Sequence, residues 1–376
     1  MPFDTSASPG RFGQRRLSPD RPVALWLFVM AGMIFVMVGL GGATRLTGSG
    51  LSIMEWAPLS GTLPPLSHAA WEKLFALYRT IPQARLLHPG MGLAGFQHLF
   101  WLEYVHRLWG RLMGVAFLLP LLWFAWRGRI GRRLGLRLAG LFVLGGLQGA
   151  VGWFMVASGF AADTVAVAPL RLMLHLGLAL TLYAAILWTA LGLARRAPAA
   201  IPAALPGALP GALPGALPGA RTARRLAAGA TLSLALTILA GSLVAGTHAG
   251  FAYNSFPLME GHLVPPDYAA LHPFARNLIA NLAAVQFDHR LLATLTLLAS
   301  LAAALAAARL GPVRRAALAF GALVVLQYGL GIATLLLIVP TGLAVIHQLN
   351  AVLALTAALV LLHGLRGAAP ALREPA

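Results

Sequence analysis

The chain has 376 residues, of which 59% are hydrophobic and 10% are charged, and it contains no cysteine. This composition excludes an ordinary soluble domain and indicates a polytopic membrane protein. The absence of cysteine excludes disulfides and thiolate ligands, so any bound metal must be held by His, carboxylate or Met.

Eight apolar segments are long enough to cross a bilayer, which takes about 20 residues. They cover residues 22–42, 103–126, 134–157, 169–194, 225–246, 285–308, 313–338 and 340–364. The predicted fold is an all-α polytopic membrane protein with eight transmembrane helices, arranged as two duplicated four-helix bundles. An even number of helices places both termini on the same side of the membrane.

The formal net charge of +18 follows from membrane topology. Most Lys and Arg residues lie in regions that alternate with weakly charged loops: the N-terminal arm, the connections 127–137, 195–225 and 309–315, and the C-terminal tail. The positive-inside rule places these regions in the cytoplasm. The basic charge therefore does not indicate nucleic acid as a partner, and membrane lipid surrounds the chain. The arm contains Asp4 and Asp20, whereas mitochondrial transit peptides are poor in acidic residues. We therefore expect a bacterial inner (cell) membrane.

Four copies of ALPG at residues 204–219 predict a linker near the middle of the chain. The segments on either side resemble each other: EYVHRL matches FDHRL, and LGGLQGAVG matches VLQYGLGIA. We therefore expect an internal duplication with parallel topology. The expected divisions are a cytoplasmic arm (1–21), an N-terminal half with a long outer loop (22–194), a cytoplasmic linker (195–224), a C-terminal half (225–364) and a cytoplasmic tail (365–376).

The first outer loop, of about sixty residues, is long for a helical bundle and suggests a lid or binding surface. Two amphipathic pieces are expected within it, SHAAWEKLFALYR and GMGLAGFQHLFWLEY. The loop begins with GGATRLTGSGLSIMEWAPLSGTLPP, in which Glu55 is the only carboxylate. This residue is either a surface glutamate that caps a turn or a proton relay at the mouth of an apolar cavity.

Four histidines lie inside apolar segments at one depth, near the outer surface: His106, His175, His289 and His347. A single such histidine would most simply form a hydrogen bond between helices. Four at matching repeat positions favour one bis-imidazole haem site in each half. Gln148 and Gln327, on the third helix of each half, contact a cofactor or link helices, and we favour the link.

Arg107 and Arg290 directly follow two of these histidines. Two interpretations stay open for both arginines. Either they pair with haem propionates, or they reach lipid phosphate at the outer surface.

The motifs GGATRLTGSGLSIMEWAPLSGTLPP, FWLEYVHRLWGR, YNSFPLMEG, VQFDHRL and IHQLNA occur in this order. Over residues 24–364 the chain resembles the haem A synthase family of proteobacteria and mitochondria. The resemblance implies oxidation of the C8 methyl group of haem O to a formyl group, which yields haem A for cytochrome oxidase. It also implies haem b ligated by His289 and His347, a substrate haem O site at His106 and His175, and a catalytic role for Glu55.

The resemblance further makes haem O synthase, a farnesyltransferase, a candidate partner, together with an unidentified electron donor. The oligomeric state stays open. The main alternative is a diheme b-type membrane cytochrome that carries electrons between quinone and a partner. A transporter with transient histidine ligands is a third interpretation.

Overall fold

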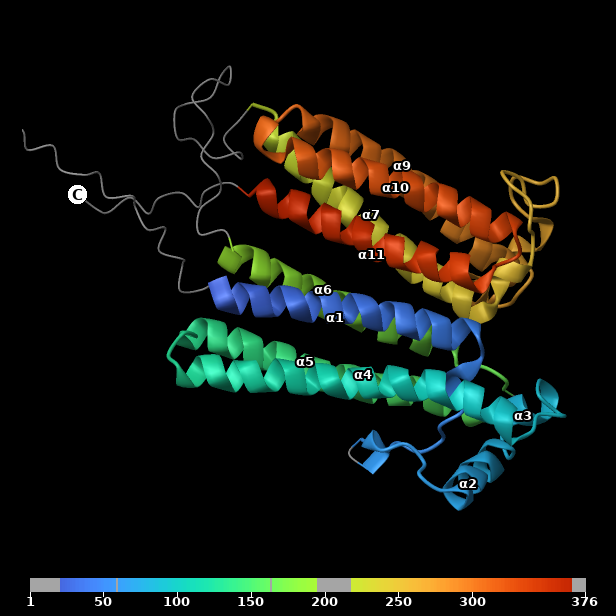
Figure 1. Cartoon of the computed structure of the whole chain (residues 1–376). Coiled ribbons are helices and arrows are strands. Elements are labelled where there is room, and N and C mark those ends of the chain that lie inside the picture. Colours follow the sequence, from blue (N-terminus) through green and yellow to red (C-terminus); the bar gives the residue numbers. More distant parts are fainter. Residues whose placement is uncertain (1–20, 59, 163, 195–217, 367–376) are drawn as a thin grey trace, which may run out of the picture.

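The computed structural model describes residues 21–58, 60–162, 164–194 and 218–366 (Figure 1). The eight expected membrane-spanning helices are confirmed within these ranges. They are α1 (Arg21–Leu46), α4 (Leu93–Trp126), α5 (Arg132–Ala157), α6 (Pro169–Ala194), α7 (Ala220–Thr247), α9 (Leu282–Ala308), α10 (Arg314–Leu336) and α11 (Thr341–Gly364). No β-strand forms in the described part of the chain. Residues 1–20 of the predicted arm, 195–217 of the linker and 367–376 of the tail lie outside the described residues.

The helices form a layered bundle (Figure 1). The central helices are α1, α6, α7 and α11, where α1 packs on α6 and α11, and α6 packs on α7. The pair α4 and α5 lies on one side, and the pair α9 and α10 on the other. Two hydrogen bonds join helices of the first half, α6 and α1, to α11 of the second half. The hydroxyls of Tyr183 and Thr356 are 2.7 Å apart, and Gln348 donates to the carbonyl of Val38 at 3.0 Å.

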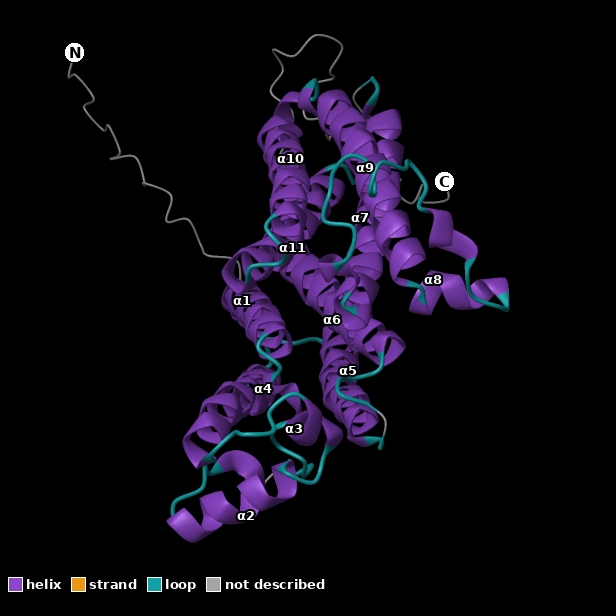
Figure 2. Cartoon of the chain, turned by 90° about the vertical axis from the view of Figure 1, so that its right-hand side faces the viewer, coloured by secondary structure: helices purple, strands orange, loops and turns teal. Residues whose placement is uncertain are grey.

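The beginning of α1 and the end of α11 lie at the same end of the bundle (Figure 1). The short helices α2 (His68–Tyr78), α3 (Pro82–Leu86) and α8 (Asn277–Ala280) lie at the opposite end. Figure 2 looks onto that end, with α2 and α3 on the α4 side of the bundle and α8 on the α9 side. The longest loops of both halves therefore gather at the end where the sequence predicts the four histidines.

The outer loop of the first half differs from expectation at one point. The first amphipathic piece forms α2, whose N-cap Ser67 accepts a hydrogen bond from the amide of Ala70 at 3.2 Å. The sequence predicts the second piece as a separate element, but it is the first part of α4, which starts at Leu93. Phe96 and Phe100 are fully or almost fully buried beneath α2, and this packing extends the helix beyond the apolar span.

Candidate functional site

The four predicted histidines lie on four different helices: His106 on α4, His175 on α6, His289 on α9 and His347 on α11. The structure brings them together as two pairs. His106 lies near His175, and His289 lies near His347. All four side chains are half-buried. Each half of the chain thus contains one pair of imidazoles.

Each imidazole lies against a glycine of a neighbouring helix. A Cβ atom built on that glycine would be between 2.8 and 3.2 Å from the histidine Cε1. The four contacts are Gly41 with His106, Gly152 with His175, Gly241 with His289 and Gly331 with His347. A side chain at any of these positions would push the ring away, because such close carbon contacts are repulsive. Glycine therefore lets each ring lie close against the neighbouring helix.

Two glutamine amides contact the rings of the second histidine in each pair. Gln148 Nε2 lies 3.1 Å from Nδ1 and 3.4 Å from Nε2 of His175. Gln327 Nε2 lies 3.2 Å from both ring nitrogens of His347. Because neither nitrogen is clearly preferred, these contacts hold the ring without selecting its tautomer. Both glutamines link neighbouring helices, as favoured from the sequence.

The donor set fits a haem better than a bare metal ion. Within the described residues, no group of three or more His, Cys, Asp or Glu side chains is close enough to hold a metal. Structural zinc requires four such ligands, whereas a haem takes two axial imidazoles. In addition, the buried Nδ1 atoms of His106 and His289 have no hydrogen-bond partner among the described side chains and backbone. A histidine that served only to link helices would use these atoms.

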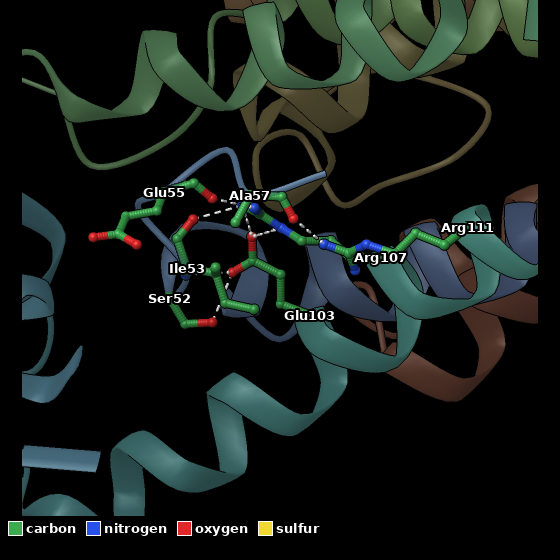
Figure 3. A network of polar contacts seen from close by, with 7 residues as sticks. All are labelled: Ser52, Ile53, Glu55, Ala57, Glu103, Arg107 and Arg111. Carbon is green, nitrogen blue, oxygen red and sulfur yellow. Dashed lines mark hydrogen bonds and ion pairs between the residues drawn. The ribbon is translucent and has the colours of Figure 1, made fainter. Parts of the chain in front are cut away.

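A buried ion pair flanks His106 in the sequence, and Figure 3 shows its polar contacts. Glu103, three residues before His106, is 2% exposed and accepts two bonds from Arg107, at 3.0 Å from Nε and 2.6 Å from Nη2. It also accepts bonds from the Ser52 hydroxyl at 2.7 Å and the Ile53 amide at 2.9 Å. The negative charge is therefore fully compensated, as burial requires.

Arg107 also holds the outer loop in place. Its guanidinium donates to the carbonyls of Ile53 at 2.5 Å and Glu55 at 2.8 Å. One helical turn further, Arg111 donates to the carbonyls of Ala57 at 2.8 Å and Pro58 at 3.0 Å. We call residues 52–58 the anchored segment. Both interpretations of Arg107, pairing with a haem propionate and reaching lipid phosphate, stay predictions.

Glu55 is exposed, and only its backbone carbonyl takes part in this network. Figure 3 shows its carboxylate directed away from Arg107 and Glu103. The adjacent Trp56 stacks on Trp153 of α5, with ring centroids 6.2 Å apart. The Glu55 carboxylate thus lies at the edge of the first half, in contact with solvent, while the buried carboxylate of the site is Glu103.

Glu103 is not among the site residues predicted from the sequence, although the sequence carries a signal for it. Glu103 and Arg107 are four residues apart on a helix, a spacing at which side chains meet. Burying a Glu–Arg pair in a membrane helix costs free energy, so such a pair usually marks a functional site. The field of Glu103 also reaches α2, where burial and this negative charge raise the pKa of Tyr78 to about 12. The Tyr78 phenol therefore stays protonated and lies 2.7 Å from His88 Nδ1.

The second half has a corresponding network without the carboxylate. Arg290 donates to the carbonyls of Tyr253 at 2.6 Å and Ser255 at 2.9 Å, and to the side-chain oxygen of Gln286 at 2.8 Å. Gln286, three residues before His289, in turn donates to the carbonyls of Ala249 and Ala252. A neutral amide thus takes the place of Glu103. The same two interpretations stay predictions for Arg290.

These features define a multi-pass helical membrane protein with an internal pair of histidines in each half. The chain matches the model of the cytochrome oxidase assembly protein family (COX15-CtaA) over residues 24–359, and it belongs to that family. It is 53% identical to the Heme A synthase of Granulibacter bethesdensis, over 96% of this chain and 95% of the relative. It is 48% identical to Heme A synthase 2 of Acidiphilium cryptum, over 94% of each chain. The Heme A synthase of Nitrosospira multiformis is 44% identical, over 96% of this chain and 98% of the relative.

Proposed function

We propose that this protein is an oxidoreductase that converts the C8 methyl group of haem O into the formyl group of haem A. In each of two successive hydroxylations, one oxygen atom of O2 enters the C–H bond and the other leaves as water with two electrons and two protons supplied by the proposed donor and solvent. The resulting gem-diol loses water to form the aldehyde. Family membership and relatives named Heme A synthase support this assignment. The structural observation that carries it is the presence of two imidazole pairs, each ring lying against a glycine.

The two halves have different roles in this proposal. His289 and His347 hold a resident haem b, and His106 and His175 hold the substrate haem O. When bound, the haem iron supplies the redox chemistry, while the chain supplies ligands, orientation and a site that excludes water. Among the described residues, the Arg that follows a paired histidine bonds a carboxylate in the half assigned to the substrate, Arg107 with Glu103, and an amide in the other half, Arg290 with Gln286. This difference supports placing the reaction in the first half.

The carboxylates of the first half have separate tasks. Glu103 holds Arg107, and through it the anchored segment, beside His106. Glu55 keeps the catalytic role expected from the sequence. Its exposed carboxylate passes protons between solvent and the site. Its backbone is held in place by Arg107, so the relay group stays next to the substrate half.

The proposed setting is the bacterial inner membrane, with both termini in the cytoplasm. The basic connections 127–137 and 309–315 support this orientation. The histidine pairs then lie near the outer surface. Proposed partners are haem O synthase, as the source of substrate, and an electron donor.

The test is haem extraction and chromatography from cells that make haem O but lack a haem A synthase, with and without this gene. We expect haem A only in cells that express the protein. A His106→Ala variant serves as the control, because it should fold and carry haem b without forming product.

Accumulation of unconverted haem O beside a folded, haem-loaded wild-type protein would contradict the proposal. That outcome would favour the diheme electron carrier, which uses the same four histidines. Loss of product in Glu55→Ala with full haem content would instead strengthen the enzyme assignment.

A further inference from the structure

The two glutamines that touch the histidine rings are equivalent in position but differ in their surroundings. Gln148 lies four residues before Gly152, and Gln327 lies four residues before Gly331. Both glycines contact the histidine that the glutamine also contacts. Differences between the two amides therefore reflect the rest of each half.

In the C-terminal half, the oxygen of the glutamine is already occupied. Asn350, which is 5% exposed, donates to the backbone carbonyl of Leu323 at 3.0 Å and to Gln327 Oε1 at 2.9 Å. A backbone carbonyl can only accept, so its contact fixes which end of the Asn350 amide carries nitrogen. Gln327 therefore turns its oxygen toward Asn350 and its nitrogen toward His347.

In the N-terminal half, the same oxygen is free. Leu178 stands three residues after His175, where the second half has Asn350 three residues after His347. Gln148 Nε2 donates to the carbonyl of His175 at 3.0 Å, which fixes the orientation of this amide as well. Gln148 Oε1 is buried and has no hydrogen-bond partner among the described residues. An unpaired buried acceptor is costly, and its presence beside a binding residue indicates a ligand donor.

The proposed ligands of the two halves differ in such a donor. Haem O carries a hydroxyl group on the side chain that bears its isoprenoid tail, whereas haem b has a vinyl group at that position. We propose that Gln148 Oε1 accepts a hydrogen bond from this hydroxyl and so selects haem O over haem b in the N-terminal half. In the C-terminal half, Asn350 occupies the equivalent oxygen, and a haem without the hydroxyl leaves no acceptor unpaired. This inference rests on the proposed function.

The test is a titration of the full-length protein in detergent. The protein is loaded with haem b, freed of excess, and titrated with haem O and separately with haem b, and binding is followed by difference absorbance. We expect the wild type to bind haem O more tightly at the exchangeable site. Gln148→Met, which keeps the side-chain length but removes the acceptor, should lower the ratio of the two affinities by about tenfold.

Two variants separate selection from general damage. Gln97→Met is the matched control, because Gln97 is a half-buried glutamine in the outer part of α4, away from both histidine pairs, and it should leave the ratio unchanged. Leu178→Asn keeps Gln148 and His175 but offers the donor that Asn350 provides in the second half. It should abolish the preference for haem O as fully as Gln148→Met does.

The ratio is the decisive quantity, since a displaced His175 would weaken both haems equally. An unchanged ratio in Gln148→Met, with haem A still formed by the wild type, would overturn this inference and leave the proposed function standing. Failure of the wild type to form haem A would instead remove the proposed function itself.

Discussion

The two halves of this protein have the same helix order but differ in how tightly the helices pack. In the apolar windows of α4 and α5, 6% of the residues are buried inside the protein, against 28% for α9 and 22% for α10. The outer pair of the N-terminal half therefore contacts its neighbours loosely, and the outer pair of the C-terminal half is well embedded.

The side chains at the helix contacts explain this difference. The buried positions of α7 and α9 are mostly alanine, including Ala223, Ala227, Ala303 and Ala307, which let two helices approach closely. The buried positions of α4 are Phe96, Phe100, Glu103, Tyr104 and Phe117. Of these rings, Phe96 and Phe100 pack beneath α2, and Phe117 packs on Trp26 of α1. A loosely packed half suits a haem that must enter and leave, and a tightly packed half suits one that stays.

Replacing the histidines should have the largest effect, and it tests whether the two halves hold different haems. His347→Ala or His289→Ala should remove the resident haem b almost completely, because each haem in the proposal depends on two axial ligands. His106→Ala or His175→Ala should abolish haem A formation and leave the resident haem in place. Pyridine haemochrome spectra of the purified variants give the haem content. Full haem b in His347→Ala would show that the halves have been assigned the wrong way round.

Glu103→Gln tests whether the carboxylate distinguishes the two halves, because it gives the first half the amide that Gln286 provides in the second. The ion pair with Arg107 is lost. A side-chain NH2 in place of the oxygen that accepts from the Ile53 amide would set one hydrogen-bond donor against another. Breaking a buried pair is strongly destabilising locally. We expect haem A yield to fall by about 100-fold, the size of the loss when groups around a reacting centre are misplaced. Hydrogen exchange of the anchored segment should become faster.

Glu72→Gln is the control for this substitution. Glu72 is on α2, its side chain is 53% exposed, and its ionic contact is the exposed His68 at 3.8 Å. It should leave both the haem A yield and the exchange rate unchanged. Equal effects of the two substitutions would show that the buried ion pair has no special role.

Long apolar runs make the helices predictable, because a span of about 20 apolar residues has few alternatives in a bilayer. The four histidines are equally visible, since they interrupt such runs at matching places. The start of α4 is not predictable in this way, because α2 buries Phe96 and Phe100. This is a tertiary contact between two helices, and no local sequence pattern reveals it. The glycine contacts of the rings likewise depend on how the helices are placed side by side.

Glu55→Ser tests whether the exposed carboxylate contributes to the difference between halves. Ser255 holds the corresponding place in the second half, where its carbonyl binds Arg290 as that of Glu55 binds Arg107. The backbone contact survives the change, so only proton transfer is affected. We expect haem A formation to fall by about tenfold, less than for Glu103→Gln, because water also carries protons at an exposed position. Haem b content should stay constant.

A pH profile of haem A formation separates this role from a structural one. The wild type and Glu55→Ser should differ in the shape of the profile if the carboxylate transfers protons. A uniform reduction at every pH would contradict a relay and assign Glu55 to the shape of the loop.

The smallest effect is expected for the hydrogen bond that joins the two halves. Tyr183 of α6 is 4% exposed, and its hydroxyl bonds Thr356 of α11 at 2.7 Å. Hydrogen bonds between membrane helices contribute about 0.6 kcal/mol on average. A double-mutant cycle of Tyr183→Phe and Thr356→Val should give a coupling energy of this size in the free energy of unfolding in detergent. The matched pair within one half is Thr237 with Thr296, 2.8 Å apart. A similar coupling energy at both sites would mean that the bond between the halves stabilises the fold as much as a bond within one half, whereas no coupling for Tyr183 would mean that this bond adds nothing to the contact between the halves.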